Sequence, residues 1–311
     1  MNVTPAQPCI ASDGAPTMDA ATLAAFYGKF GLRVVRSASA WWVEAGPRFL
    51  LAVPSHHAIH VPDDEARELF RRERVAGLRY MCDESDIGKK SFQLSCSDAG
   101  YSIEKLSANT RSKVRRGLSR NELRRIGGAE LLEVGQGAFM ETMRRQNRAS
   151  ASTLETWKRM LRAADSEPAI EIWSAWHEGE FASYLITIRI DDVCEFFQAR
   201  SRNELLKHYP NNALIFHVTE EMLVRRGIRE ITFGIESPED VEDLDAFKLA
   251  LGYEKKPIRQ RVLFHPLLRA ALGVPPLRRL LHIAGARPGA NVKWRKASGL
   301  VRFAEEQDRG E

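Results

Sequence analysis

The stretch that decides the fold covers residues 209–253 and reads YPNNALIFHVTEEMLVRRGIREITFGIESPEDVEDLDAFKLALGY. After Pro210, apolar residues recur at every third or fourth position, which predicts an amphipathic helix that ends at Gly227. The short apolar run Ile231–Phe233 predicts a buried strand, and a second helical pattern covers Leu244–Leu251. A helix, a buried strand and another helix predict a segment that joins a sheet built by the rest of the chain.

The residues around this stretch predict most of that sheet. Three strand-like runs precede it and are separated by tight turns, which predicts an antiparallel meander. Two helices with Arg-rich outer faces and a short strand come before the meander, and one more strand follows the stretch. In chain order we expect a strand over 129–134, helices over 138–147 and 154–164, strands over 169–176, 181–190 and 193–199, and a strand over 255–264.

The first half of the chain has the pattern of an α+β unit with a largely antiparallel sheet. We expect helices over 19–30 and 63–75, strands over 32–36, 40–45, 48–53, 58–61, 77–82, 92–96 and 101–106, and a long basic helix over 107–126. The predicted domains are a loose leader over 1–18, an N-terminal domain over 19–127, a C-terminal domain over 128–265 and a basic amphipathic helical tail over 266–311.

The composition is that of a globular protein without a membrane span. The chain has 311 residues, of which 44% are apolar and 28% charged, so we expect about two domains. No apolar run approaches the ~20 residues that cross a bilayer, and the N-terminus has no signal-peptide pattern. Four scattered cysteines without a CxxC pair predict reduced, mostly buried thiols and no metal site. These features predict a cytoplasmic protein.

Positive charge is concentrated near the C-terminus. Residues 255–302 contain twelve Lys and Arg and no Asp or Glu, while the whole chain has a net charge of +5. Leu and Arg alternate on both sides of Pro275-Pro276, which predicts two short amphipathic helices in the tail. Such helices can lie on anionic lipid at the inner membrane face, or they can pack on the N-terminal domain. Of the two, we favour packing.

Three motifs resemble the FemAB-like branch of the GNAT acyltransferase superfamily. Residues 107–117 read SANTRSKVRRG and are similar to the family's Arg-x-x-(Ile/Val)-Arg-Arg helix. Residues 210–215 read PNNALI, where the family has a Pro-x-x-(Leu)-Leu helix start. ITFG at 231–234, followed by FK at 247–248 and Gly252, resembles the family's Asp-Phe-Gly and Phe-Lys-x-x-x-Gly ending.

The resemblance covers about residues 30–265 and implies an α+β fold. It implies tandem GNAT-like domains with mixed, mostly antiparallel sheets flanked by helices, ahead of the helical tail. It also implies an N-acyltransferase that transfers an acyl or aminoacyl group to an amine on a cell-envelope or exopolysaccharide precursor, phosphorylated or lipid-linked. No bound cofactor is implied, because the acyl donor is a co-substrate: acyl-CoA, acyl carrier protein or aminoacyl-tRNA.

Two alternatives stay open beside this expectation. One is a peptidyltransferase that depends on aminoacyl-tRNA. The other is a non-catalytic protein with the GNAT fold that binds anionic lipid or nucleic acid through its basic surfaces.

The resemblance places catalytic residues at Phe247 and Lys248. A cation beside the reacting carbonyl stabilises the oxyanion that develops during acyl transfer. An amine acceptor must also lose a proton, and Glu195 on the meander is the candidate general base. Glu236, after the buried strand, is a second carboxylate that we expect to bind substrate.

We expect the turn before Pro210 to hold the donor. The N–H groups and the dipole of a helix N-terminus attract anions. The glycines with which ordinary GNAT enzymes approach the pyrophosphate of coenzyme A are missing here. The candidate donor-binding residues are instead Arg200, Arg202, Lys207, Tyr209, Asn211 and Asn212. We expect the basic helix to face this turn across a cleft and to bind a phosphorylated acceptor or tRNA through Arg111, Arg115 and Arg116.

Overall fold

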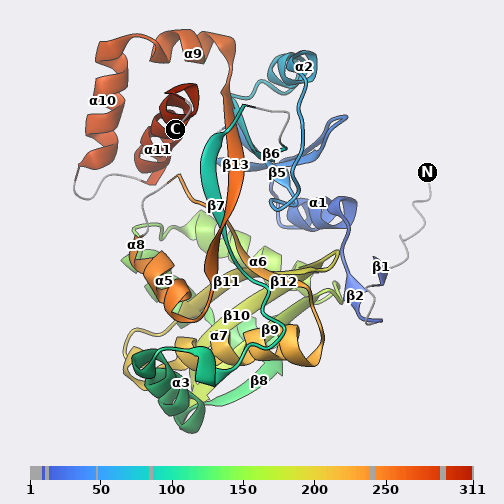
Figure 1. Ribbon diagram of the computed structural model, residues 1–311, viewed down its shortest axis with the longest axis vertical. Coiled ribbons are helices and arrows are strands. Elements are labelled where there is room, and N and C mark those ends of the chain that lie inside the picture. Colours follow the sequence, from blue (N-terminus) through green and yellow to red (C-terminus); the bar gives the residue numbers. More distant parts are fainter. Residues whose placement is uncertain are drawn as a thin grey trace. The chain divides into compact units, whose positions relative to one another are not determined.

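The computed structural model describes residues 9–10, 14–46, 48–83, 87–238, 242–287 and 292–309. The chain forms two compact units, and each is assembled from separate segments (Figure 1). Unit 1 contains the described residues up to Phe30, residues 95–233 and residues 247–253. Unit 2 contains residues 31–94, 234–246 and the described residues from Glu254 onward.

The division into units differs from the domain boundaries that the sequence predicts. It falls inside strands β7 (Lys89–Cys96) and β12 (Glu230–Ile235). The expected boundary after residue 127 lies inside unit 1, because the elements just before it pack with the second half of the chain. The leader over residues 1–18 was expected to be loose, but its last residue is fixed to unit 1. Met18 is 1% exposed, and its N–H donates to the Arg189 carbonyl at 2.9 Å.

The sheet of unit 1 orders its strands as β12, β11 (Val193–Ser201), β10 (Glu180–Ile190), β9 (Ile170–His177) and β8 (Glu122–Ile126). Neighbouring strands are antiparallel except β11 and β12, which are parallel. The expected meander is confirmed, because β9, β10 and β11 pair in sequence order. A register shift between Ile186 and Thr187 places a bulge in β11 opposite them.

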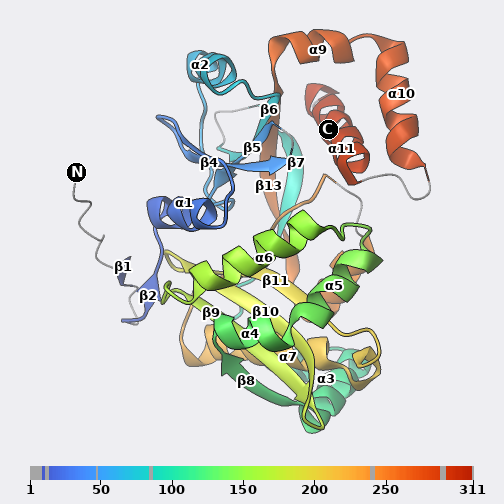
Figure 2. The same ribbon diagram turned by 180° about the vertical axis from the view of Figure 1, so that it is seen from behind.

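Helices cover both faces of this sheet. α7 (Pro210–Glu220) and α3 (Ala108–Arg120) lie on the face toward the viewer in Figure 1. α4 (Gly128–Val134), α5 (Gln136–Arg145) and α6 (Ala151–Ala164) lie on the face toward the viewer in Figure 2. α7 is confirmed as expected, and a π-helical turn over Glu221–Arg225 follows it before Gly227.

Helix α3 is shorter than the sequence predicts. It ends at Asn121, whose side chain donates to the carbonyls of Gly117 (2.7 Å) and His208 (3.0 Å). Residues 122–126, expected to continue the helix, form β8 and pair with β9. The expectation of one helix over 107–126 is therefore wrong. The edge of β9 decides the conformation of these residues, and a local pattern cannot show that edge.

Residues 128–134, expected as a strand, form helix α4. The N–H of Ala129 donates to the Asp165 carboxylate at 3.0 Å, so an acidic group at the end of α6 caps this helix. A distant cap of this kind leaves no signal next to the helix in the sequence.

Residues 101–106, also expected as a strand, form only a 3-10 turn over Ile103–Lys105. Tyr101 is buried, and its hydroxyl donates to the Leu251 carbonyl at 2.8 Å. A tertiary contact therefore overrides the β-propensity of this short run.

The sheet of unit 2 orders its strands as β3 (Val34–Arg36), β4 (Trp41–Gly46), β5 (Phe49–Val53), β6 (Gly77–Cys82), β13 (Glu254–Phe264) and β7. β5 and β6 are parallel and joined by helix α2 (Asp63–Glu73), while β3–β4, β4–β5 and β6–β13 are antiparallel. The run 58–61 gives a single bridge from Ile59 to Cys82 where a strand was expected. Both sheets are mixed and mostly antiparallel, which confirms the expected fold class.

The described part of the tail is helical, as expected. It contains α9 (Pro266–Leu272), α10 (Pro275–Ala286) and α11 (Val292–Arg309), and Pro275 begins α10. α10 and α11 approach closely at Gly285, where a Cβ would lie 2.5 Å from the Cβ of Ser298. α11 was not predicted, and it packs Leu300 and Phe303 against Val262 of β13.

Two expectations concern the chain as a whole, namely that it has no membrane-spanning segment and that its cysteines are mostly buried. Among the residues that the structure describes, no helix is both long and apolar enough to cross a bilayer. Cys82, Cys96 and Cys194 are buried, as expected. The side chain of Cys9 lies outside the described residues.

Candidate active site

Lys248 lies against an aromatic cluster in unit 1. Its Nζ is 4.7 Å from the centroid of the Phe233 ring at the end of β12, a cation–π distance. The Phe233 ring contacts the rings of Tyr253 (4.8 Å between centroids) and Phe196 (5.2 Å). Phe247 packs against the same core. Phe247 and Lys248, which are neighbours in the chain, therefore both contact this aromatic core, and their catalytic role stays a prediction.

Hydrogen bonds tie this lysine-bearing segment to α7. The hydroxyl of Tyr253 lies 2.7 Å from that of Thr219 near the C-terminus of α7. Burial raises the pKa of Tyr253 well above its ordinary value, so its hydroxyl stays protonated. Lys248 is thus held on a fixed base rather than on a mobile loop.

The ladder between β11 and β12 is short. The two parallel strands pair only from Val193 to Glu195 on β11 and from Glu230 to Thr232 on β12. β11 continues to Ser201, so its backbone groups beyond Glu195 are not paired with β12 within the described register. Such a strand edge accepts an extended ligand by backbone hydrogen bonds. This feature could not be predicted from the sequence, because strand register is not encoded locally.

Glu195 lies at the end of this ladder, on the other face of the sheet. Its neighbours Cys194 and Phe196 belong to the core beneath α7, so alternation along β11 directs Glu195 away from it. Burial raises the pKa of Glu195 to about 7. The pKa of Tyr27 is also raised, first by its own burial and then by the negative charge of Glu195. A carboxyl with this pKa can accept a proton near neutral pH. The structure does not place it beside Lys248.

The two arginines of the predicted donor turn have different surroundings. Arg202 is 2.8 Å from a Glu141 oxygen and 3.9 Å from a Glu180 oxygen, and it also pairs with Glu204. These carboxylates neutralise it, so it offers little to a phosphate. Arg200 makes no ion pair with any carboxylate in the described part of the chain.

The start of α7 carries the other predicted donor residues. Tyr209 has a left-handed backbone (φ 58°), and no described side chain caps the first turn. The side chain of Asn211 donates to the Ser201 hydroxyl at 3.2 Å, which fixes the turn to the end of β11. Asn212 is half-buried in the same turn, and Lys207 is exposed in the preceding 3-10 turn. The donor-binding role of this N-terminus stays a prediction, and the turn has none of the glycines of an ordinary coenzyme A site.

The basic helix α3 packs directly on α7 within unit 1. A Cβ at Gly117 would lie 2.6 Å from the Tyr209 carbonyl oxygen, so only glycine permits this approach. The Arg116 guanidinium lies 4.7 Å from the centroid of the Tyr209 ring. The expectation that this helix faces α7 across a cleft is therefore wrong, because the two helices are in contact.

The acidic partners of α3 are few and exposed. Arg115 is 3.9 Å from Glu104, and both side chains are more than 60% exposed, so this pair contributes about 0–1 kcal/mol at most. Arg111 donates to the backbone carbonyl of Glu104 at 3.2 Å. The face of α3 next to the α7 N-terminus therefore keeps most of its positive charge.

Glu236 belongs to unit 2 and takes part in a polar network there. The Ser91 hydroxyl donates to its carboxylate at 2.6 Å, and the Gln260 amide donates to Ser91 at 2.6 Å. Arg79 donates to Gln260 at 2.9 Å, and burial lowers the pKa of Arg79 to about 10. The predicted substrate-binding role of Glu236 stays a prediction, since its carboxylate already has a partner.

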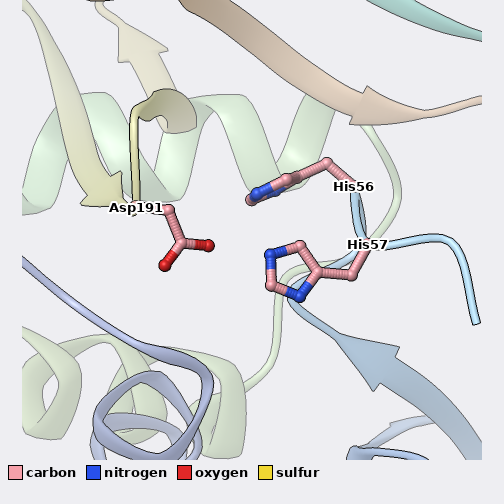
Figure 3. Close-up of side chains that lie close together, drawn as sticks. All are labelled: His56, His57 and Asp191. Atoms are coloured by element: carbon pink, nitrogen blue, oxygen red, sulfur yellow. The ribbon is translucent and has the colours of Figure 1, made fainter.

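Figure 3 draws three side chains of a kind that can bind a metal ion: His56, His57 and Asp191. The two histidine rings belong to unit 2, where their centroids are 4.7 Å apart. Asp191 belongs to unit 1. Because the residues are divided between the units, no metal site is assigned to them.

Comparison with known proteins agrees with this geometry. Residues 104–248 match the family model of the acetyltransferase (GNAT) domain. The fold is similar to that of FemX, with a TM-score of 0.57 and 12% identity over 80% of this chain and 92% of that chain. No curated protein matches the chain in sequence.

Two further solved structures share the fold. One is L-PGS from Bacillus licheniformis, with a TM-score of 0.51 and 11% identity over 85% of this chain and 93% of that chain. The other, from Agrobacterium fabrum, is described as the C-terminal domain of a lysylphosphatidylglycerol synthetase. It has a TM-score of 0.53 and 11% identity over 81% of this chain and 89% of that chain.

The family match identifies a GNAT acyltransferase domain at residues 104–248, and the fold agrees with this class. Over most of its length the chain has a fold similar to that of FemX. The matched range includes β11, β12, α7 and Lys248.

Proposed function

We propose that the protein transfers an acyl or aminoacyl group to the amine of a cell-envelope or exopolysaccharide precursor. The observation that carries the proposal is the position of Lys248. Its ammonium group is held over Phe233, the β12 residue that follows Thr232, where the ladder with β11 stops. A donor laid along the unpaired edge of β11 would have its carbonyl near this cation.

The proposed reaction needs one base and one oxyanion stabiliser. Glu195 takes a proton from the acceptor ammonium, and the free amine attacks the donor carbonyl. Lys248 stabilises the negative oxygen of the tetrahedral intermediate. The carbonyl re-forms as the bond to the leaving group breaks, and the leaving group takes up a proton.

The donor is proposed to carry phosphate. The uncapped start of α7 and the nearby cations of α3 favour an anionic group. The similar structure from Agrobacterium fabrum is described as a domain of a lysylphosphatidylglycerol synthetase. This description supports an aminoacyl group as the group that is transferred. Acyl-CoA and acyl carrier protein offer the same phosphate chemistry.

The proposal is tested by a transfer assay with the full chain. Acyl-CoA, acyl carrier protein and aminoacyl-tRNA are each incubated with amino-sugar phosphates and peptidyl amines, and products are identified by intact mass. A thermal-shift panel chooses the donor, since stabilisation grows as RT ln(1 + [L]/Kd). We expect one donor class to raise the mass of an acceptor by the acyl group. No transfer with any donor would contradict the proposal.

A second candidate donor, aminoacyl-tRNA, is favoured specifically by α3. Its cations next to Tyr209 have few acidic partners, as a phosphate-binding surface requires. We expect the double variant Arg115→Gln/Arg116→Gln to weaken tRNA binding and to lower the slope of log K against log salt by about 2. The matched control is Arg159→Gln/Arg162→Gln, which removes two exposed cations from α6. An equal salt slope in both double variants would exclude α3 as the tRNA surface.

A further inference from the structure

A separate cavity of about 370 Å³ lies in unit 1, on the face of the sheet that carries α5 and α6. Its walls combine apolar residues with the hydroxyl residues Ser152, Thr153 and Thr156. The Phe139 and Trp157 rings stack at 4.7 Å between centroids with an angle of 16°. The remaining apolar wall residues are Phe30, Met143, Met160 and Phe197. Such walls suit a ligand with an aromatic or aliphatic body.

The bulge in β11 directs two polar side chains into this cavity. The register shift leaves Phe197 as the extra residue, so Phe197 and Gln198 both line the cavity. Arg200, two positions further on, lines it as well. Glu195 points to the same face of the sheet from the start of this stretch.

A directed chain of hydrogen bonds fixes the orientation of Gln198. The Trp157 indole, which can only donate, bonds the Tyr184 hydroxyl at 3.0 Å. Tyr184 in turn donates to the Gln198 carbonyl oxygen at 2.7 Å, and burial raises the pKa of Tyr184, so the proton stays in place. The oxygen of Gln198 is therefore occupied, and its NH₂ group, which can only donate, serves the cavity.

Arg200 supplies the charge of the cavity. One of its terminal nitrogens donates to the Ala199 carbonyl at 2.6 Å, while its buried Nε has no partner. Burial and the charges of Arg148 and Arg145 disfavour its charged form and lower its pKa. None of the residues that line the cavity is acidic. A half-buried cation among other cations is costly unless an anion joins it.

We infer that this cavity binds a small organic acid. Arg200 and the amide of Gln198 hold its carboxylate or phosphate, and the stacked rings of α5 and α6 hold its apolar body. Arg200 and the Gln198 amide can only donate, and the lining hydroxyls of Ser152, Thr153 and Thr156 can donate as well. An anion, which only accepts, therefore fits this set of polar groups better than a neutral amide does. The inference deepens the proposed function and rests on it in one respect. It identifies the acid as the amine-bearing acceptor, bound on the face of the sheet toward which Glu195 points.

Binding can be measured without turnover, by calorimetric titration of the full chain. The probes are 3-phenylpropionate, 2-phenylethyl phosphate and the neutral 3-phenylpropionamide. We expect at least one anion to bind at least 10-fold more tightly than the amide. A tighter carboxylate indicates a carboxylic acid as the natural group, and a tighter phosphate indicates a phosphate ester. Equal affinity for anions and amide, or no binding of any probe, would overturn the inference.

Two variants test the residues. Arg200→Gln should weaken the anion at least 10-fold and leave the amide within 2-fold, while the matched control Arg162→Gln, exposed on α6, should change neither. Gln198→Glu keeps the acceptor for Tyr184 and replaces the donor with a carboxylate, so it should also weaken the anion at least 10-fold. Gln198→Glu replaces Arg200→Gln as the test if circular dichroism shows that Arg200→Gln does not fold. Wild-type anion affinity in the folded variants would overturn the inference and leave the role of Lys248 untouched.

Discussion

Arg200 and Arg202 show that the role of a single residue depends on the partners that the fold places around it. They lie two residues apart, and the sequence gives both the same predicted role. Arg202 contacts carboxylates from α5 and β10, whereas Arg200 lines a cavity without acids. The partners come from distant parts of the chain, so only the fold shows which cation is neutralised. The pair Phe247 and Lys248 could be predicted because its motif is local.

The pH dependence of transfer tests Glu195. Because burial raises its pKa to about 7, the carboxylate that accepts the proton forms only as pH rises through 7. We expect the wild-type rate to rise through this region. Glu195→Gln should lower the rate by about 10²–10⁴-fold and remove the rise. The exposed Glu133→Gln serves as control, and an unchanged pH profile in Glu195→Gln would exclude this base.

Stability should change with pH at the same residue. Between its ordinary pKa of 4.5 and about 7, Glu195 keeps its proton in the folded state and loses it in the unfolded state. The free energy of unfolding of the wild type therefore falls as pH rises across this window. Glu195→Gln has no carboxyl at this position and should not show this fall. Between pH 4 and pH 8, the wild type should therefore lose about 1–3 kcal/mol more of its free energy of unfolding than Glu195→Gln does. Urea unfolding at both pH values measures it.

At the scale of elements, periodicity predicted the meander, α7 and the strands on either side of the lysine helix. It failed where a distant partner decides the local structure. β8 is a strand because β9 offers it an edge, and α4 is a helix capped by Asp165. The short β11–β12 ladder and the bulge at Phe197 were also beyond prediction, although they shape both the candidate active site and the acid-binding cavity.

The contact between α3 and α7 can be tested at Gly117. A Cβ there would lie 2.6 Å from the Tyr209 carbonyl, which is backbone and cannot turn away. We expect Gly117→Ala to reduce the free energy of unfolding by about 1–3 kcal/mol, despite the better helix propensity of alanine. Ser112→Ala, on the exposed side of α3, should have little effect. Equal urea midpoints for the two variants would contradict the close approach.

At the scale of the whole molecule, motif order predicted the class of protein better than it predicted the division of the chain. Each unit combines segments from both halves of the sequence, and the chain changes unit within β7 and β12. A strand that starts in one unit and ends in the other has no composition shift or linker to mark the change. The helical tail was predicted, but not that its last helix completes the core of unit 2.

The tail helix α11 should contribute to the stability of unit 2. Phe303 is 3% exposed beside Val262, so Phe303→Ala should cost about 3–5 kcal/mol. Leu280 on α10 is 63% exposed, and Leu280→Ala should change the stability by less than about 0.5 kcal/mol. Chemical unfolding, with hydrogen exchange of the β13 amides as the probe, measures the stability change of each variant. Similar losses in the two variants would mean that α11 does not pack as described.

The central claim, that Lys248 stabilises the oxyanion of acyl transfer, is tested most directly by single-turnover transfer with Lys248→Met. The donor is the one that the thermal-shift panel selects, and the exposed Lys90→Met is the matched control. We expect the chemical step to slow by about 10²–10³-fold in Lys248→Met, with unchanged donor affinity and circular dichroism. The control should react like the wild type. Near-normal turnover with methionine at position 248 would contradict the account.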